Sequence, residues 1–176
     1  MIPFVRRRRS RPSPAKGAIA GLIAGLAATW VMTRFQYAAP PERFAEVLGE
    51  DDLPVGEQSE PGTEKAASAI SRTVLDRRLS EDEKETAGQV VHYAMGGVSA
   101  TIYGVASEYL PLLTRDGGIG FGTAVWLLAD EVTVPATGLS SPPWEHPLST
   151  HAYTLSSHLV YGATTELVRG IVRRLL

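Results

Sequence analysis

Segregation of charge along the chain constrains its fold more than any other feature. Residues 38–87 carry thirteen acidic and six basic residues, whereas other stretches are apolar and nearly free of charge. A helix needs roughly 20 apolar residues to cross a hydrocarbon core about 30 Å thick. The apolar stretches have that length, so they predict a membrane protein even though the mean hydropathy of the whole chain is close to zero.

The apolar stretches predict an all-α integral membrane protein. Its four transmembrane helices would form an antiparallel bundle, accompanied by one short amphipathic helix outside the membrane. The predicted spans are residues 17–37, 88–112, 118–137 and 150–168.

The connecting segments differ in composition. The N-terminus is basic and is expected to be disordered, residues 38–62 resemble an acidic loop broken by Pro and Gly, and the last loop is rich in Pro. These segments are residues 1–16, 38–87, 138–149 and the basic C-terminus 169–176.

Local signals place two helix starts and one turn. Apolar side chains recur at helical spacing over about residues 63–79, which predicts the amphipathic helix. Ser80 and Glu83 have the spacing of a capping box and would begin the helix of the second span. The short turn at residues 114–117 predicts that the second and third spans are antiparallel neighbours.

Basic residues at the span ends predict the orientation. Six basic residues, among them Arg6 to Arg9, precede the first span, and three arginines follow the fourth. Cytoplasmic ends of membrane proteins are enriched in Lys and Arg. Both termini are therefore expected in the cytoplasm of a bacterial inner-membrane protein, with residues 38–87 and 138–149 outside. A cleaved signal peptide is the alternative interpretation of residues 1–39.

Charged and titratable residues within the spans are the candidate functional site. Asp130 and Glu131 are adjacent in an apolar run, and successive helical residues diverge by about 100°. One is expected to face the bundle and the other a neighbouring helix, a partner chain or the headgroups. The predicted topology brings six residues to the outer half of the bundle: Arg34, His92, Asp130, Glu131, His151 and His158. Two further carboxylates, Glu108 and Glu166, lie near the inner ends.

Several roles for this outer layer stay open. The residues can join helices by hydrogen bonds, with Arg34 pairing a carboxylate, or they can bind protons, since histidine titrates near neutral pH. A metal site is a weaker alternative, because His151 and His158 are seven residues apart and lie about 10.5 Å apart along a helix. Neither Ser156–Ser157–His158 nor the glycine-rich residues 117–122 occur in the context that catalysis or nucleotide binding requires.

Small residues at four-residue spacing predict close helix packing. The glycines concerned are Gly17, Gly21, Gly25, Gly96, Gly97 and Gly104. They suggest contacts within a bundle, a homo-oligomer or a larger membrane complex.

Five segments together resemble the YagU-like family of small bacterial inner-membrane proteins. They are KGAIAGLIAGL, APPER, HYAMGGVSATIYGVASEYLP, FGTAVWLLADEVTVPATGLSSPP and HPLSTHAYTLSSHLVYGATTELVRG. The resemblance implies a four-helix inner-membrane protein of a family with one member linked to acid resistance, and it implies no catalytic residues. Residues 44–86 are the part least similar to the family.

Two functions follow as expectations. The first is a structural or accessory subunit of an oligomer or larger membrane complex, and the second is a proton-responsive or proton-conducting bundle that supports acid tolerance. Partners are expected to be the lipid bilayer and other membrane proteins. The net charge of -2 argues against a nucleic-acid partner, and the chain has no cysteine for a disulfide or a thiolate metal site. No cofactor, metal or enzymatic activity is expected, an intramembrane metal-dependent enzyme being the remote alternative.

Overall fold

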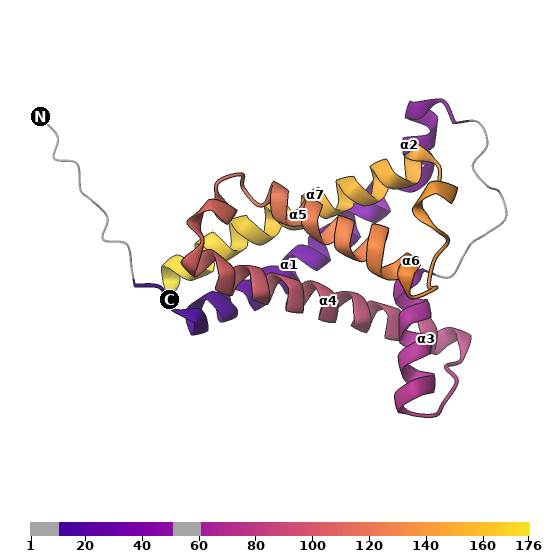
Figure 1. Ribbon diagram of the computed structural model, residues 1–176, viewed down its shortest axis with the longest axis horizontal. Helices are drawn as coiled ribbons and strands as arrows, with labels where there is room; N and C mark the ends of the chain where they lie inside the picture. Colours follow the sequence, from indigo (N-terminus) through magenta and orange to yellow (C-terminus); the bar gives the residue numbers. More distant parts are fainter. Residues whose placement is uncertain (1–10, 51–60) are drawn as a thin grey trace, which may run out of the picture.

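The structure of the protein, a computed structural model, describes residues 11–50 and 61–176 (Figure 1). Within these ranges the chain is helical and forms no strand, so the all-α prediction is confirmed. The predicted anchor Arg6 to Arg9 and the part of the outer loop at residues 51–60 lie outside the described residues.

Four long helical segments make the bundle. They are α1 (Pro14–Ala38), α4 (Glu81–Tyr109), α7 (Leu148–Leu175) and a composite segment of α5 (Ile119–Trp126), the π-helical η2 (Leu127–Thr133) and α6 (Val134–Ala136). Short helices join them: α2 (Pro41–Leu48), α3 (Gly62–Val74), η1 (Pro111–Thr114) and η3 (Pro143–Glu145).

Local sequence signals set the ends of these helices. The Ser13 side chain caps α1 ahead of Pro14, and Ser80 and Glu83 form the expected capping box at the start of α4. The helix α4 ends at Tyr109, three residues before the predicted limit of 112, because Pro111 begins a tighter 3₁₀ turn.

Two predictions for the acidic segment need correction. Residues 41–48 form α2, where a loop was expected, because Pro41 starts a helical turn and Gly49, at φ 68°, ends it. The amphipathic helix α3 ends at Val74 instead of about 79. There Asp76 adopts φ 49° and the chain turns back, so that the amide of Arg77 donates to the carbonyl of Ser71 over 3.3 Å.

The helix α1 lies at the centre of the bundle. It packs mainly on α4 and α7, while α5 packs mainly on α7. The predicted pairing of the second and third spans is therefore incomplete. The segment α5 meets α4 through one aromatic stack, in which the rings of Tyr103 and Phe121 are 4.2 Å apart.

Glycines explain these two pairings. Cβ atoms on Gly17 and Gly25 would lie 2.6 Å and 2.5 Å from the carbonyl oxygens of Gly104 and Gly96, so α1 and α4 are in backbone contact. Gly122 and Gly162 allow a similar approach of α5 to α7. The predicted glycine ridges therefore pack against other helices of the same chain.

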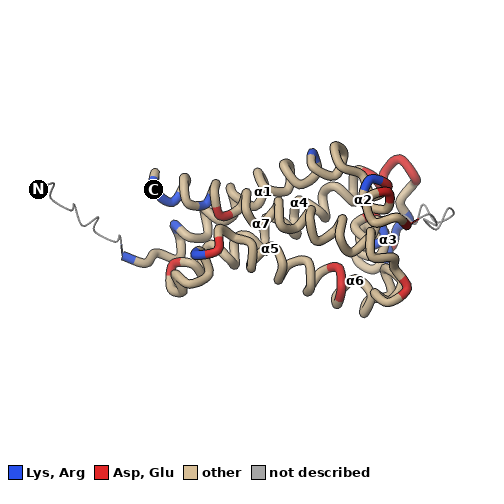
Figure 2. Tube along the Cα trace, turned by 90° about the horizontal axis from the view of Figure 1, so that it is seen from above, with Lys and Arg blue, Asp and Glu red and all other residues tan. Residues whose placement is uncertain are grey.

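Small side chains fill the interior of the bundle, and large apolar side chains lie on its surface. The buried positions of the long helices are mostly Gly, Ala, Ser and Thr, and the larger buried side chains are Met32, Tyr103, His158, Tyr161 and Arg169. Large aliphatic side chains point outward, and Leu22, Val98 and Leu128 are 46%, 60% and 61% exposed. Lys, Arg, Asp and Glu gather at the two ends of the bundle (Figure 2). By length and composition, α1 is the one described helix that qualifies as a membrane span, a property it shares with signal sequences and buried core helices.

Candidate functional site

Asp130 and Glu131 both reach α7, contrary to the prediction that they would face different neighbours. The Glu131 carboxylate lies 2.8 Å from Nδ1 of His151, and the Asp130 carboxylate lies 3.5 Å from Nδ1 of His158. Both carboxylates lie in the π-helical η2, and the Thr133 hydroxyl at its end donates to the carbonyl oxygen of Leu128 over 2.6 Å. The wider π turn changes the directions of adjacent side chains from those of an α-helix.

His151 is held from two sides. Its Nδ1 lies against Glu131, and its Nε2 lies 3.0 Å from the carbonyl oxygen of Pro143 in η3. A carbonyl oxygen only accepts hydrogen bonds, and so does an ionised carboxylate, whereas a neutral imidazole has one N–H. Both bonds can form together only when one additional proton sits on His151 or on Glu131.

His158 is more deeply buried and has a different set of neighbours. Its Nδ1 donates to the carbonyl oxygen of Thr154 over 2.9 Å, with Asp130 slightly farther from the same nitrogen. A neutral imidazole satisfies this arrangement. His92 of α4 is close enough for its charge to repel that of His158 when both are protonated. Three of the predicted residues, His92, Asp130 and His158, therefore come together below the Glu131–His151 pair.

Arg34 does not join this layer as predicted. Its guanidinium lies over the Trp30 ring at 5.5 Å from the centroid, and it makes no ion pair with any carboxylate of the described residues. The arginine is exposed near the C-terminal end of α1, beside a cavity shared with α3 and α4.

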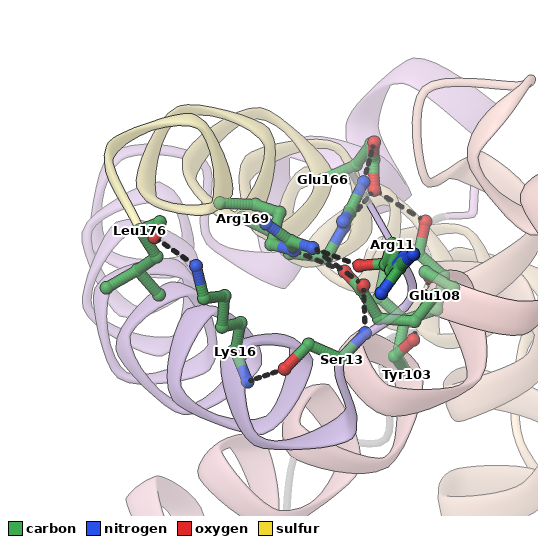
Figure 3. A network of polar contacts seen from close by, with 10 residues as sticks. Arg11, Ser13, Lys16, Tyr103, Glu108, Glu166, Arg169 and Leu176 are labelled. Atoms are coloured by element: carbon green, nitrogen blue, oxygen red, sulfur yellow. Dashed lines mark hydrogen bonds and ion pairs between the residues drawn. The ribbon is translucent and has the colours of Figure 1, made fainter. Parts of the chain in front are cut away.

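The predicted inner carboxylates belong to a buried network at the opposite end (Figure 3). Arg173 binds both oxygens of Glu108, at 2.5 Å and 2.9 Å, and the amide of Ser13 donates to the same carboxylate. Arg169 binds both oxygens of Glu166 at 2.7 Å, and the Tyr103 hydroxyl donates to Glu166 over 2.8 Å. The network ties both ends of the chain to α4.

The basic half of this network is missing from the sequence-based prediction, which assigns the arginines after residue 168 to a basic cytoplasmic C-terminus. The i, i+3 spacing of Glu166 and Arg169 is a readable signal for one pair. Nothing in the sequence indicates the pair between Glu108 and Arg173, which are 65 residues apart.

A family model of proteins of unknown function, DUF1440, matches residues 64–167, which is more than half of the chain. The chain belongs to the DUF1440 family. The matched region contains both His–carboxylate pairs, His92, Glu108 and Glu166, and it excludes α1 and the two paired arginines of the inner network. The chain is similar to no curated protein and to no solved structure at a significant level.

No group of three or more potential metal ligands converges within residues 11–50 and 61–176. The titratable residues of the outer layer instead form the Glu131–His151 pair and the Asp130–His158 pair with His92 beside it. These two sets place side chains that can bind protons next to one another in this DUF1440 chain.

Proposed function

We propose that this DUF1440 protein is a multi-pass inner-membrane protein whose outer end responds to protons. The distribution of small side chains inside the bundle and large apolar side chains on its surface supports the membrane placement. Water-soluble monomers rarely expose large contiguous apolar surfaces, whereas α1, α4, α5 and α7 all direct large aliphatic side chains outward. Small residues at the helix interfaces are typical of membrane bundles.

The packing of α1 supports its retention in the mature protein. Its Gly and Ala face packs against α4 and α7, so cleavage as a signal peptide would expose the backbone of α4 and uncover the face of α7 that packs on α1. The predicted orientation, with both termini in the cytoplasm, gains support from the hydrogen bond between the Lys16 ammonium and the carbonyl of Leu176, which brings the two basic ends together.

The position of His151 between two acceptors carries the functional proposal. With the additional proton bound, His151 bridges η2 and η3, because Glu131 and Pro143 are both bonded. Loss of that proton removes one of the two hydrogen bonds of His151, so that His151 then holds only one of η2 and η3. Acidification outside the membrane would supply this proton, so that His151 holds η2 and η3 together at the outer end. This function agrees with the resemblance to the YagU-like family and its link to acid resistance.

Other charged groups surround this switch. Glu50 of the acidic segment accepts from the amide of Ser149 over 3.2 Å, and the His146 ring lies 6.3 Å from that of His151. On the inner side, Asp130 and His92 face His158. Protonation of His158 would convert its contact with Asp130 into an ion pair while His92 opposes that charge.

A distance measurement across η2 and η3 tests the proposal. The chain has no cysteine, so Val132→Cys and Trp144→Cys would carry the only spin labels. In lipid nanodiscs, the distance distribution is expected to be narrow at pH 5 and broad at pH 8. His151→Gln keeps a hydrogen-bonding side chain without a titrating group and should abolish this change. His146→Gln, which alters a neighbouring histidine without a carboxylate partner, should preserve it.

Two outcomes contradict the proposal: a distribution in the wild type that does not change with pH, or an unchanged transition in His151→Gln. Glu131→Gln provides a second test that retains the hydrogen bond without the carboxylate charge. Proton flux into liposomes loaded with a pH-sensitive dye then distinguishes a conducting bundle from one that only responds.

An accessory subunit of a larger complex is the second candidate, and one surface favours it. The extramembrane helix α3 exposes Ile70 and Val74, at 52% and 73%, although it packs on α4 along its other side. Size determination after purification in mild detergent tests this function. An assembly that is lost in Ile70→Ser/Val74→Ser supports it, whereas a single chain in both proteins contradicts it.

A further inference from the structure

A cavity of about 710 Å³ opens at the outer end of the bundle. Residues of α1, α3, α4 and α7 line it, with Arg34, Glu64 and Glu85 as its charged groups. His92, which lies beside His158, also forms part of its wall, so the cavity adjoins the Asp130–His158 pair without including it. If the membrane placement proposed above is correct, the cavity lies at the level of the outer lipid headgroups, where α1 ends and α4 enters the bilayer.

The three charged side chains of the cavity have no ionic partners among the described residues. Arg34 lies over the Trp30 ring without an ion pair or side-chain hydrogen bond, and neither Glu64 nor Glu85 takes part in an ion pair or side-chain hydrogen bond with the described chain. Oppositely charged groups that share a cavity without pairing are suited to a ligand that carries both signs of charge.

Close helix packing fixes the position of one of these carboxylates. Gly88 of α4 lies against α3, and a Cβ at this position would stand 2.5 Å from Cγ of Glu64 and 3.2 Å from its backbone amide nitrogen. Glu64 is therefore held at the wall of the cavity by the contact between the two helices.

Aromatic rings form much of the remaining wall. Trp30, Tyr37, Tyr93 and Tyr153 all line the cavity. Trp and Tyr are enriched at the membrane–water interface, where their rings lie at headgroup level. This lining suits a ligand whose polar head lies among charged groups and whose apolar part continues into the bilayer.

We infer that this cavity binds the phosphoethanolamine headgroup of a membrane lipid, with the phosphate at Arg34 and the ammonium at Glu64 and Glu85. A primary ammonium donates three hydrogen bonds and an arginine binds phosphate oxygens through its fork of N–H groups. Phosphatidylglycerol has no ammonium to offset the two carboxylates, and the quaternary ammonium of phosphatidylcholine donates no hydrogen bond.

Lipid retention from a defined mixture tests this inference. The purified protein would be reconstituted in bilayers of equal parts phosphatidylethanolamine, phosphatidylcholine and phosphatidylglycerol, and the lipids bound after extraction would be counted by native mass spectrometry. Phosphatidylethanolamine is expected to be retained preferentially. Equal retention of the three lipids, or preference for phosphatidylglycerol, would overturn the inference. Binding of soluble phosphoethanolamine by a protein that retains no phosphatidylethanolamine would also overturn it, since the ligand would then be a small molecule.

Charge-neutralising variants locate the site. Arg34→Gln and Glu64→Gln should each lower the affinity for phosphatidylethanolamine by roughly tenfold or more, as expected for the loss of a charge-assisted hydrogen bond. Arg43→Gln and Glu46→Gln are matched controls, because both residues are exposed on α2 and lie outside the cavity. Equal losses in all four variants would contradict a site in this cavity.

The inference rests on the proposed membrane placement, and the two can fail separately. If the placement is wrong, alkaline washing releases the wild-type protein from membranes. If only the headgroup site is wrong, the wild-type protein and Arg34→Gln both stay in the membrane and retain the same lipids.

Discussion

Gly25 of α1 lies in backbone contact with Gly96 of α4, so that a Cβ on Gly25 would stand 2.5 Å from the Gly96 carbonyl oxygen and 2.6 Å from Cβ of Ala100. Neither neighbour is the free end of a flexible side chain. Any side chain at this position requires the two helices to separate.

Replacement of Gly25 by Ala is therefore expected to destabilise the protein. Overpacking of a filled interior costs about 1–3 kcal/mol, and the expected loss in the free energy of unfolding lies in that range. Unfolding in mixed micelles of mild detergent and dodecyl sulfate, followed by circular dichroism, measures it. Gly170→Ala is the matched control, since a Cβ at this position of α7 would have no packing neighbour within 4 Å. A similar loss in both variants would refute the role of the α1–α4 contact.

The Glu108–Arg173 pair predicts a second effect on stability. The side chains are only 7% and 12% exposed, so removal of one charge leaves the other buried without its partner. Hydrogen bonds to charged groups contribute about 1.5–3 kcal/mol, and Glu108→Gln, which keeps a neutral acceptor for Arg173, is expected to lower the free energy of unfolding by about 1–3 kcal/mol. The Glu145→Gln variant, at an exposed site, provides the control.

A double-mutant cycle separates the pair from its surroundings. Arg173→Met should be destabilising alone, and Glu108→Gln/Arg173→Met should lose less than the sum of the single variants. Additive losses would show that Glu108 and Arg173 do not depend on each other. The hydrogen bonds from Ser13 to Glu108 and from Arg173 to the carbonyl of Arg11 would then account for the effects.

The capping box of α4 predicts a pH effect outside the proposed membrane region. The Arg77 guanidinium, followed by the amide and hydroxyl of Ser80, lowers the pKa of Glu83 from 4.5 to about 2. Because this pKa is lower in the folded state, the contribution of Glu83 to helix stability is present above about pH 4.5 and is lost as the pH falls through about 2. A carboxyl-carbon NMR titration should place the midpoint of Glu83 near 2, and Arg77→Gln should raise it. An ordinary glutamate midpoint in the wild type would contradict the pairing.

The helical class and most helix positions could be predicted because they depend on local signals. Ser80 and Glu83 mark the start of α4, and Pro111 marks its end. The same kind of signal was present for α2, where Pro41 and Gly49 flank the helix, but the acidic composition led to the prediction of a loop.

The site was harder to predict because it depends on helix geometry and long-range packing. The separate pairing of His151 with Glu131 and of His158 with Asp130 depends on the π-helical turn of η2. The glycines indicated close approach without identifying the partner, so α1 and α4 could not be matched in advance. Arg34 ends near an aromatic ring, a contact that charge pairing alone does not predict.

Single-cysteine labelling is expected to reveal the proposed topology directly, since the native chain contains no cysteine. Glu46→Cys in α2 and Ser141→Cys between α6 and η3 report on the proposed outer end, and Arg115→Cys after η1 and Leu176→Cys after α7 report on the proposed inner end. A membrane-impermeant maleimide added to intact cells should label only the outer pair, because charged reagents do not cross the hydrocarbon core. After permeabilisation all four should react, which controls for local burial. Labelling at position 176 in intact cells, or equal labelling of all four positions, would exclude a bundle with both termini in the cytoplasm. Loss of the first 39 residues from the purified chain would instead identify α1 as a signal peptide.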